Sequence, residues 1–341
     1  MKFTEKLSRR WHDDNTLLCV GLDPNPSRFP KELQGDLEAV LKFCTGIVDA
    51  THDLVCAFKP QIAYFASSRG GEEVLEAVIR HIHEHHPDIP VILDAKRGDI
   101  GSTAEHYARE AFERYNADCV TLSPFMGYDT IMPYLSYADR GAFVLCRTSN
   151  KGGDDFQMLE VNGEKIYERI ARLAATEWNV SGQLGLVVGA TYPNELANVR
   201  RIAPDLPLLV PGIGAQGGDI DAAVRAGVTA KKDGMVINSG RAILYASAED
   251  DWREAARKAA IARATRSTRP ADFPRFSLVR TARDLFRSAG RLRIMSDRSE
   301  TGGPGPSSED SLAVHRHLFF VDDDLRGELS VPGLLQIAFA H

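Results

Sequence analysis

The sequence predicts an α/β protein folded as a closed (β/α)8 barrel, and two observations lead to this fold class. Eight short, nearly continuous apolar runs alternate with longer amphipathic stretches. That pattern is typical of parallel strands buried on both faces and joined by helices. Polar and charged residues cluster at the C-terminal ends of these runs, where a barrel gathers the groups of its active site.

The predicted elements follow one another regularly along the chain. Strands are expected at residues 16–23, 55–61, 90–96, 119–123, 141–148, 184–190, 206–213 and 234–239. Helical periodicity is clear between them, for example at 71–83 and 103–115, and a helix rich in Ala and Arg follows at 249–266. A doubly wound open sheet is the alternative, but it usually has fewer strands, and no GxGxxG follows the first strand.

The composition changes after the last predicted helix. Residues 267–341 contain ten arginines and no lysine, whereas residues 1–266 contain eleven lysines. The segment 302–308 reads GGPGPSS, which is a linker composition. We therefore expect a barrel domain at 1–266 and a C-terminal tail of uncertain order at 267–341.

The bulk composition narrows the class of protein. Hydrophobic residues make up 43% of the chain, charged residues 26%, and the net charge is −6, so neither nucleic-acid nor membrane-surface binding is expected. The first eleven residues lack the apolar core of a signal peptide, and no apolar run is long enough to span a bilayer. Five cysteines occur without a CxxC pair, which indicates buried thiols in a reducing cytoplasm.

Charged residues at three strand ends predict a functional site. Asp94, Lys96 and Asp99 lie at or just beyond the end of the third strand, Lys59 near the end of the second, and Asp23 at the end of the first. Asp94 and Lys96 are two apart, so on a strand their side chains share a face. A structural ion-pair network or a solvated rim is the alternative, but charge clusters at a barrel mouth favour function.

Two glycine-containing segments predict a phosphate site. Residues 211–218 (PGIGAQGG) follow the seventh strand, and residues 238–241 (NSGR) follow the eighth. Glycines allow backbone N–H groups to approach an anion, and a helix starting near Arg241 would add its positive end. The glycines could instead serve tight turns only. Loops seven and eight of barrels recur as phosphate sites, and the adjoining arginine favours that interpretation.

These motifs resemble the orotidine 5′-phosphate decarboxylase family. The resemblance starts from Asp-x-Lys-x-x-Asp-Ile at residues 94–100 and extends through the adjoining Gly-Ser-Thr at 101–103. The loops at 123–127 (SPFMG) and 188–193 (VGATYP) resemble the longer bacterial subgroup of that family. The match runs in order from about residue 18 to residue 246 and so covers the predicted barrel, whereas the family pattern does not explain the tail after about residue 270.

The resemblance implies a reaction and its catalytic groups. The reaction would be the decarboxylation of orotidine 5′-phosphate to UMP, without metal or organic cofactor. Lys96 would donate the proton to C6 of the pyrimidine, Asp94 would lie beside the departing carboxylate, and Lys59 would link Asp94 to the ribose. Loss of CO₂ leaves a carbanion whose charge no conjugation spreads, so a fixed ammonium beside it can stabilise it and then protonate it.

The resemblance also implies the residues that bind substrate. Asp23 would bind a ribose hydroxyl and Ser123 the base. The phosphate would be held around Pro211 by Gln216, Gly240 and Arg241.

A homodimer with shared active sites is implied as well. Asp99, Ile100 and Thr103 would reach into the site of a second subunit. Lys96, by contrast, ends its strand and would serve its own barrel.

Two other functions and one other site stay open at this point. A sugar-phosphate decarboxylase or aldolase on the same barrel would use Asp-x-Lys-x-x-Asp with magnesium, and a non-catalytic barrel would only bind nucleotide phosphates. His81, His83, His85 and His86 could look like a metal cluster. They fall at a helix end on the face opposite the predicted site, and we interpret them as a solvated helix terminus.

Overall fold

The computed structural model describes residues 1–33, 37–213 and 218–268. Eight parallel strands form its centre, in the order β2-β1-β10-β9-β8-β5-β4-β3. The strands are β1 (Leu18–Leu22), β2 (Ala57–Pro60), β3 (Ile92–Arg97), β4 (Cys119–Leu122), β5 (Gly141–Arg147), β8 (Leu184–Val188), β9 (Leu208–Val210) and β10 (Met235–Ser239). Each lies within or beside one of the eight predicted runs.

The sheet closes on itself. Single bridges pair Phe58 with Val91 and Gln61 with Asp94, so β2 and β3, at the two ends of the strand order, meet. Parallel strands joined by helices and closed in this way form a (β/α)8 barrel, which confirms the predicted fold class. The C-terminal ends of all eight strands therefore open on one face.

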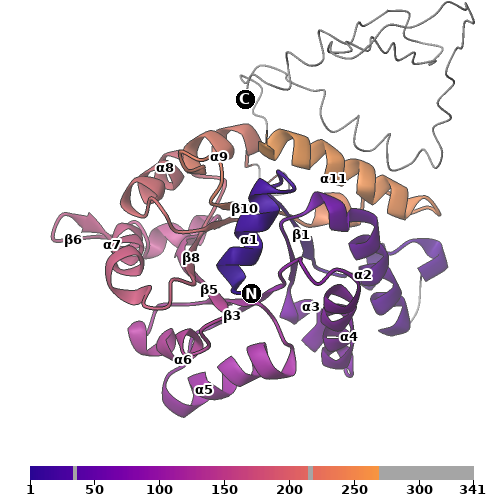
Figure 1. Ribbon diagram of the computed structural model, residues 1–341, viewed down its shortest axis with the longest axis horizontal. Helices are drawn as coiled ribbons and strands as arrows, with labels where there is room; N and C mark the ends of the chain where they lie inside the picture. The colour runs from indigo at the N-terminus through magenta and orange to yellow at the C-terminus, as the bar shows by residue number, and fades with distance from the viewer. Residues whose placement is uncertain (34–36, 214–217, 269–341) are drawn as a thin grey trace, which may run out of the picture. The chain divides into compact units, whose positions relative to one another are not determined.

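Helices surround the strands, as Figure 1 shows. The longer ones are α2 (Leu37–Thr51), α4 (Gly71–His85), α5 (Gly101–Arg109), α7 (Ile166–Leu173), α8 (Pro193–Ile202), α9 (Ile220–Gly227) and α11 (Trp252–Thr268). Short helices lie in the connections at α3 (Ile62–Ala66), α6 (Met132–Leu135) and α10 (Arg241–Leu244). The predicted helices at 71–83, 103–115 and 249–266 thus correspond to α4, to α5 with a π turn at Glu110–Arg114, and to α11.

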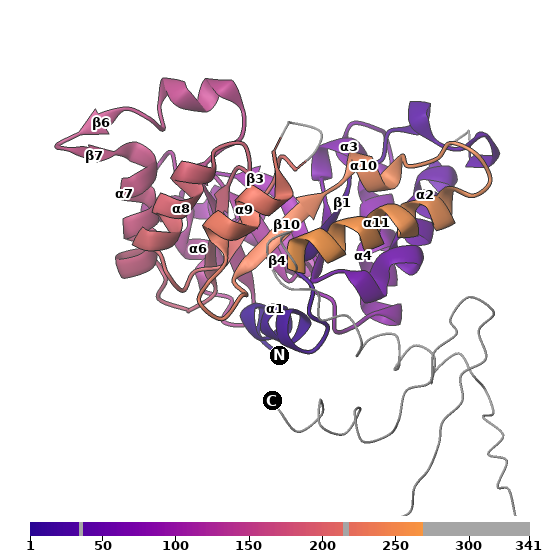
Figure 2. The ribbon, with the colours of Figure 1, turned by 90° about the horizontal axis from the view of Figure 1, so that it is seen from above.

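A further helix, α1 (Phe3–His12), closes the N-terminal end of the barrel (Figure 2). Phe3 and Leu7 are buried in the cluster that fills the barrel interior, together with Phe143. The rings of Phe3 and Phe143 meet edge to face, with centroids 5.9 Å apart. A methyl group added at Gly141 would lie 2.2 Å from the Phe3 ring. Glycine at this position therefore leaves the space that the Phe3 ring occupies.

The outer layer of the core lies between the strands and the helices. Trp252 at the start of α11 is fully buried and stacks on Phe43 of α2, with ring centroids 5.2 Å apart. Its indole Nε1 donates to Glu32 at 2.7 Å. Trp252 also packs over Gly46, where a Cβ would lie 2.4 Å from the indole. The last helix of the barrel is in this way fixed to the first βα unit.

The sequence analysis missed one hairpin. β6 (Glu160–Val161) and β7 (Glu164–Lys165) pair antiparallel in the segment between β5 and α7. The turn residues Asn162 and Gly163 both have positive φ, 55° and 78°. Asn-Gly is the dipeptide that such two-residue turns require, so the signal was present in the sequence.

All five cysteines are free and buried, as their apolar context predicts. Within the described residues, no helix has both the length and the apolar character needed to cross a bilayer. The predicted tail, apart from its first two residues, lies outside the described part of the chain, so the boundary near residue 266 stays a prediction.

Candidate active site

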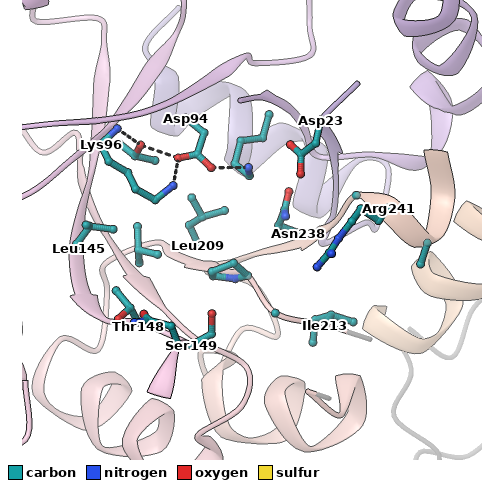
Figure 3. Close-up of a pocket in the computed structure, with 18 residues that line it drawn as sticks. Asp23, Asp94, Lys96, Leu145, Thr148, Ser149, Leu209, Ile213, Asn238 and Arg241 are labelled. Carbon is teal, nitrogen blue, oxygen red and sulfur yellow. Dashed lines mark hydrogen bonds and ion pairs between the residues drawn. The ribbon is translucent and has the colours of Figure 1, made fainter. Parts of the chain in front are cut away.

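A cavity of about 430 Å³ opens at the C-terminal ends of the strands. Its volume falls in the range of small-molecule sites. Seven residues singled out in the sequence line it, namely Asp23, Lys59, Asp94, Lys96, Pro211, Gly240 and Arg241. Figure 3 shows Lys96 and Asp94 on one side of the cavity and Arg241 on the other.

Asp94 is the centre of an ion-pair network. One carboxylate oxygen accepts from Lys59 Nζ at 2.7 Å, and the other accepts from Lys96 Nζ at 2.6 Å. The Lys59 side chain is 4% exposed and that of Lys96 is 47% exposed. One ammonium group is therefore enclosed by the protein, while the other faces the cavity and can meet a ligand.

The backbone around Lys96 departs from regular strand geometry. Lys96 has φ of +48°, in the left-handed region that side chains other than glycine seldom adopt. The register between β3 and β4 also shifts between Leu93 and Arg97. The shared face of Asp94 and Lys96 was predicted from a regular strand, and the side chains do meet, but at an irregularity of the kind that re-aims side chains beside active sites.

Thr121 in β4 holds this irregular segment in place. Its hydroxyl accepts from the backbone N–H groups of Ala95 and Lys96, at 3.0 and 2.9 Å. The same hydroxyl donates to the Asp94 carboxylate at 3.0 Å. Thr121 is buried, so one side chain satisfies two backbone donors and orients the central carboxylate.

The charges of the network stabilise one another. Burial disfavours the ionised form of Asp94, but the ammonium groups of Lys59 and Lys96 outweigh it and hold the pKa of this carboxyl well below its usual range. Burial also opposes the charge on Lys59, yet Asp94 and Asp23 raise the pKa of Lys59 above its ordinary value. Asp94 and Lys59 are therefore both charged at neutral pH.

Asp23 has a different environment, directly after β1. Burial raises the pKa of Asp23, with the charge of Lys59 opposing the rise. Its Oδ1 is buried without a hydrogen-bond partner within the described residues. The Tyr245 hydroxyl donates to the backbone carbonyl of Asp23 at 2.8 Å and so fixes the start of the loop. A buried acceptor aimed at a cavity is suited to a ligand hydroxyl.

The opposite end of the cavity is formed by the segments after β9 and β10. Pro211, Gly212 and Ile213 line it, and Gly212 has φ of +97°, a conformation that favours glycine. α10 begins at Arg241, directly after Gly240, as the sequence indicated. Gln216 lies outside the described residues. The described part of this end thus supplies a guanidinium group and a backbone that a ligand can approach closely. Both suit an anionic group.

Four of the predicted site residues do not line the cavity of their own chain. Asp99 accepts a hydrogen bond from the backbone of Ile100 at 2.8 Å, Ile100 is 49% exposed, and Thr103 is exposed on α5. Ser123 lies against Gly98, where an added Cβ would approach its side chain to 3.0 Å. The roles assigned to these four residues by resemblance stay predictions.

Comparison with known proteins identifies the family. The model of the orotidine 5′-phosphate decarboxylase / HUMPS family matches residues 16–259. The chain belongs to this family.

Curated relatives match over almost their whole length. The orotidine 5′-phosphate decarboxylase of Ralstonia pickettii (strain 12J) is 63% identical over 262 residues, which cover 77% of this chain and 96% of the relative. That of Dechloromonas aromatica (strain RCB) is 63% identical over 261 residues, covering 76% and 96%.

A solved structure of the same family is also similar to this chain. The OMP decarboxylase of Leishmania donovani has a TM-score of 0.66 and 42% identity, with 76% of this chain and 95% of that one covered. The fold, the order of the motifs and the curated relatives therefore agree.

Several cavity residues were missed in the sequence. Thr121 lies within the apolar run CVTL, where a threonine is unremarkable because it also favours strands. Asn238, by contrast, was included in the predicted phosphate segment at 238–241; it lines the cavity from within β10 rather than after it. Thr148, Ser149 and Asn150 line it from the segment directly after β5. Their signal was available, because polar residues following a barrel strand face the active-site end.

Proposed function

We propose that this chain catalyses the decarboxylation of orotidine 5′-phosphate to UMP in pyrimidine biosynthesis, with Lys96 as the proton donor. Its relatives at 63% identity are named for this activity. The observation that carries the mechanism is the cavity-facing ammonium of Lys96, held 2.6 Å from the ionised Asp94. An ammonium in a fixed position can stabilise a developing carbanion and then protonate it.

The proposed reaction breaks one carbon–carbon bond and forms one carbon–hydrogen bond. The bond between C6 and the carboxylate breaks, CO₂ leaves, and the electron pair stays on C6. Lys96 then gives one N–H proton to C6 and is left as a neutral amine, which regains a proton from solvent. Asp94 stays ionised throughout, because Lys59 balances its charge from the buried side.

The ends of the cavity suit the rest of the nucleotide. Oδ1 of Asp23, which has no hydrogen-bond partner in the described part of the chain, would accept from a ribose hydroxyl. Arg241 and the backbone near Gly240 would hold the phosphate, with Gln216 as a further contact. Binding energy gained at the phosphate, far from the reacting bond, can be used to orient the base.

The donor set of the cavity favours this reaction over a magnesium-dependent one. Both oxygens of Asp94 already accept from ammonium groups. In the described ranges, the one group of three imidazole or carboxylate side chains close enough to hold a metal lies elsewhere. A hard divalent cation needs several oxygen ligands. Two carboxylates line this cavity, and that of Asp94 is already paired with both lysines. No metal or organic cofactor is proposed for catalysis.

We propose further that two copies of the chain share their active sites. Asp99, Ile100 and Thr103 do not line the active-site cavity of their own chain. Exposed apolar side chains accompany them in the segment after β4 and on α6, with Phe125 at 83%, Met126 at 48% and Met132 at 55%. Such a patch is typical of an interaction surface, and a two-fold interface would exchange the Asp99 loops.

One assay tests the reaction and its mechanism. The absorbance change of orotidine 5′-phosphate should proceed at the same rate with and without EDTA. Lys96→Ala should lower kcat by at least about 10²–10⁴-fold, since the general acid is lost. Lys42→Ala, at an exposed lysine paired with Glu38, is the matched control and should be unaffected. Loss of activity in EDTA with recovery in magnesium would support the sugar-phosphate alternative. Nucleotide binding without turnover would support the non-catalytic one.

A further inference from the structure

A histidine cluster lies at the end of the barrel opposite the cavity. α2 and α4 lead into the N-terminal ends of β2 and β3, so the C-terminal ends of both helices lie on the far side from the active site. Asp49 is in the last turn of α2, His81 is in the last turns of α4, and His86 caps α4. The sequence suggested a solvated helix terminus here, and it could not show that Asp49 approaches from the neighbouring helix.

The three side chains converge on one point. Asp49 Oδ1 lies 2.7 Å from His81 Nε2 and 3.3 Å from His86 Nε2. One ligand atom from each of the three residues falls within 4.8 Å of the others. Their side chains are 54%, 21% and 15% exposed, respectively. The point is therefore accessible from solvent but walled by the two imidazole rings.

Two further histidines hold these rings in place. His52 stacks on His86 with centroids 4.2 Å apart, and His85 stacks on His81 at 4.3 Å. His52 Nδ1 lies 2.9 Å from the carbonyl oxygen of Asp49, and His85 Nδ1 lies 3.0 Å from that of His81. A carbonyl only accepts, so these nitrogens carry protons and both supporting rings are oriented. A pre-arranged pair of imidazoles loses less freedom on binding.

We propose that Asp49, His81 and His86 form a binding site for a divalent transition-metal ion of the zinc class. His81 and His86 would each supply Nε2, Asp49 one carboxylate oxygen, and water the fourth position. Imidazole with one carboxylate is a ligand set of zinc, copper or nickel, whereas magnesium and calcium prefer oxygen alone.

Two of the three ligand separations are close to those expected around such an ion. Tetrahedral ligands at about 2.0–2.1 Å from zinc are roughly 3.3 Å apart. Asp49 and His86 already have this separation, at 3.3 Å, and Asp49 and His81 are closer, at 2.7 Å, because they share a hydrogen bond. The hydrogen that each Nε2 shares with Asp49 must leave when the ion binds, because zinc bonds to a lone pair of the ring nitrogen.

The metal would join α2 to α4 on the face away from the reaction. It would raise the melting temperature of the barrel, since a ligand that binds only the folded chain stabilises it. Turnover would not change, because none of its ligands lines the cavity. The five cysteines are buried and do not compete for the ion at this surface.

Calorimetric titration of the full chain with zinc chloride alone tests the proposal, after stripping with EDTA and removal of the chelator. Wild type should bind one zinc ion that His81→Ala, His86→Ala and Asp49→Asn each weaken by at least about tenfold. His83→Ala is the matched control, because this ring on the same helix contacts the carbonyl oxygen of Asn116 at 3.1 Å instead. It should bind zinc as wild type does.

Melting temperature with and without zinc gives a second readout, and turnover of each variant shows that it has folded. The rise in melting temperature should be present in wild type and His83→Ala and absent from the three cluster variants. The proposal is overturned if wild type binds no zinc saturably, if folded cluster variants bind it like wild type, or if His83→Ala loses as much affinity as they do.

Discussion

Thr121 shows how a single hydroxyl can set the geometry of charged catalytic groups. It is neither charged nor in a motif, yet it contacts the carboxylate of Asp94 and the backbone of Lys96. Its removal leaves two backbone N–H groups without the acceptor on which they depend. A buried donor without an acceptor costs about 1–3 kcal/mol, so the irregular conformation at Lys96 should relax.

We predict that Thr121→Val lowers kcat by about one to two orders of magnitude while KM changes less, because Lys96 loses its position rather than its charge. Steady-state kinetics measures this split. Thr121→Ser should restore most of the rate. Thr51→Val is a suitable control, since that buried hydroxyl donates to the carbonyl oxygen of Ile47 at 2.7 Å, within α2. Equal loss in both valine variants would indicate general destabilisation.

The charged residues of the site could be predicted most directly, whereas some of its uncharged residues could not. Asp23, Lys59, Asp94 and Lys96 are conspicuous because burying charge at a strand end is costly without a purpose. Thr121 is an ordinary residue for a strand, and only the closed barrel shows that it faces the cavity. A buried charge at a strand end is energetically unusual and therefore indicates a functional site, whereas a threonine in a strand does not.

At the scale of elements, the strands were predictable and the attachments between helices were not. Continuous apolar runs determine a buried parallel strand directly. The contact of α11 with α2 depends instead on Trp252 and Gly46, which are 206 positions apart in the printed numbering. The local sequence around Gly46 does not indicate that this glycine leaves space for the indole of Trp252.

We predict that Gly46→Ala destabilises the chain by about 1–3 kcal/mol, although alanine is the better helix former. The added Cβ would lie 2.4 Å from Trp252, which is fully buried and has little room to shift. Urea unfolding measures the effect, with Thr45→Ala on the same helix as the control. In a Trp252→Leu background the cost of the alanine should shrink, and an unchanged cost would show that the indole is not its cause.

At the scale of the whole molecule, the barrel predicts which parts of the chain the reaction needs. The relatives are covered over 96% of their length by matches that span 76–77% of this chain. α11 is the last described helix and ends at Thr268, with Ser267 buried. A chain truncated after Thr268 should therefore retain the melting temperature and kcat of the full chain. Insolubility or a marked loss of either would show that the barrel depends on the residues that follow.

The proposed shared site makes a second prediction at this scale. Lys96→Ala and Asp99→Ala chains should each be nearly inactive alone and should recover activity when they are mixed and exchange subunits. A hybrid dimer places both defects in one site and leaves the other intact, so about a quarter of all sites should work after random exchange. Absence of recovery, with exchange shown by mass spectrometry, would mean that Asp99 acts within its own chain.

Every cysteine is buried, so the reactivity of the thiols can be used to measure local unfolding of the barrel. Burial raises the pKa of Cys56 to about 12, and it raises the pKa values of Cys19, Cys44, Cys119 and Cys146 as well. Thiol reagents attack the thiolate, so the closed barrel should be almost inert to them. Cys19 and Cys119 belong to interior strands, and Cys44 belongs to α2 under α11. The order in which alkylation reaches these positions would show which layer of the barrel separates first.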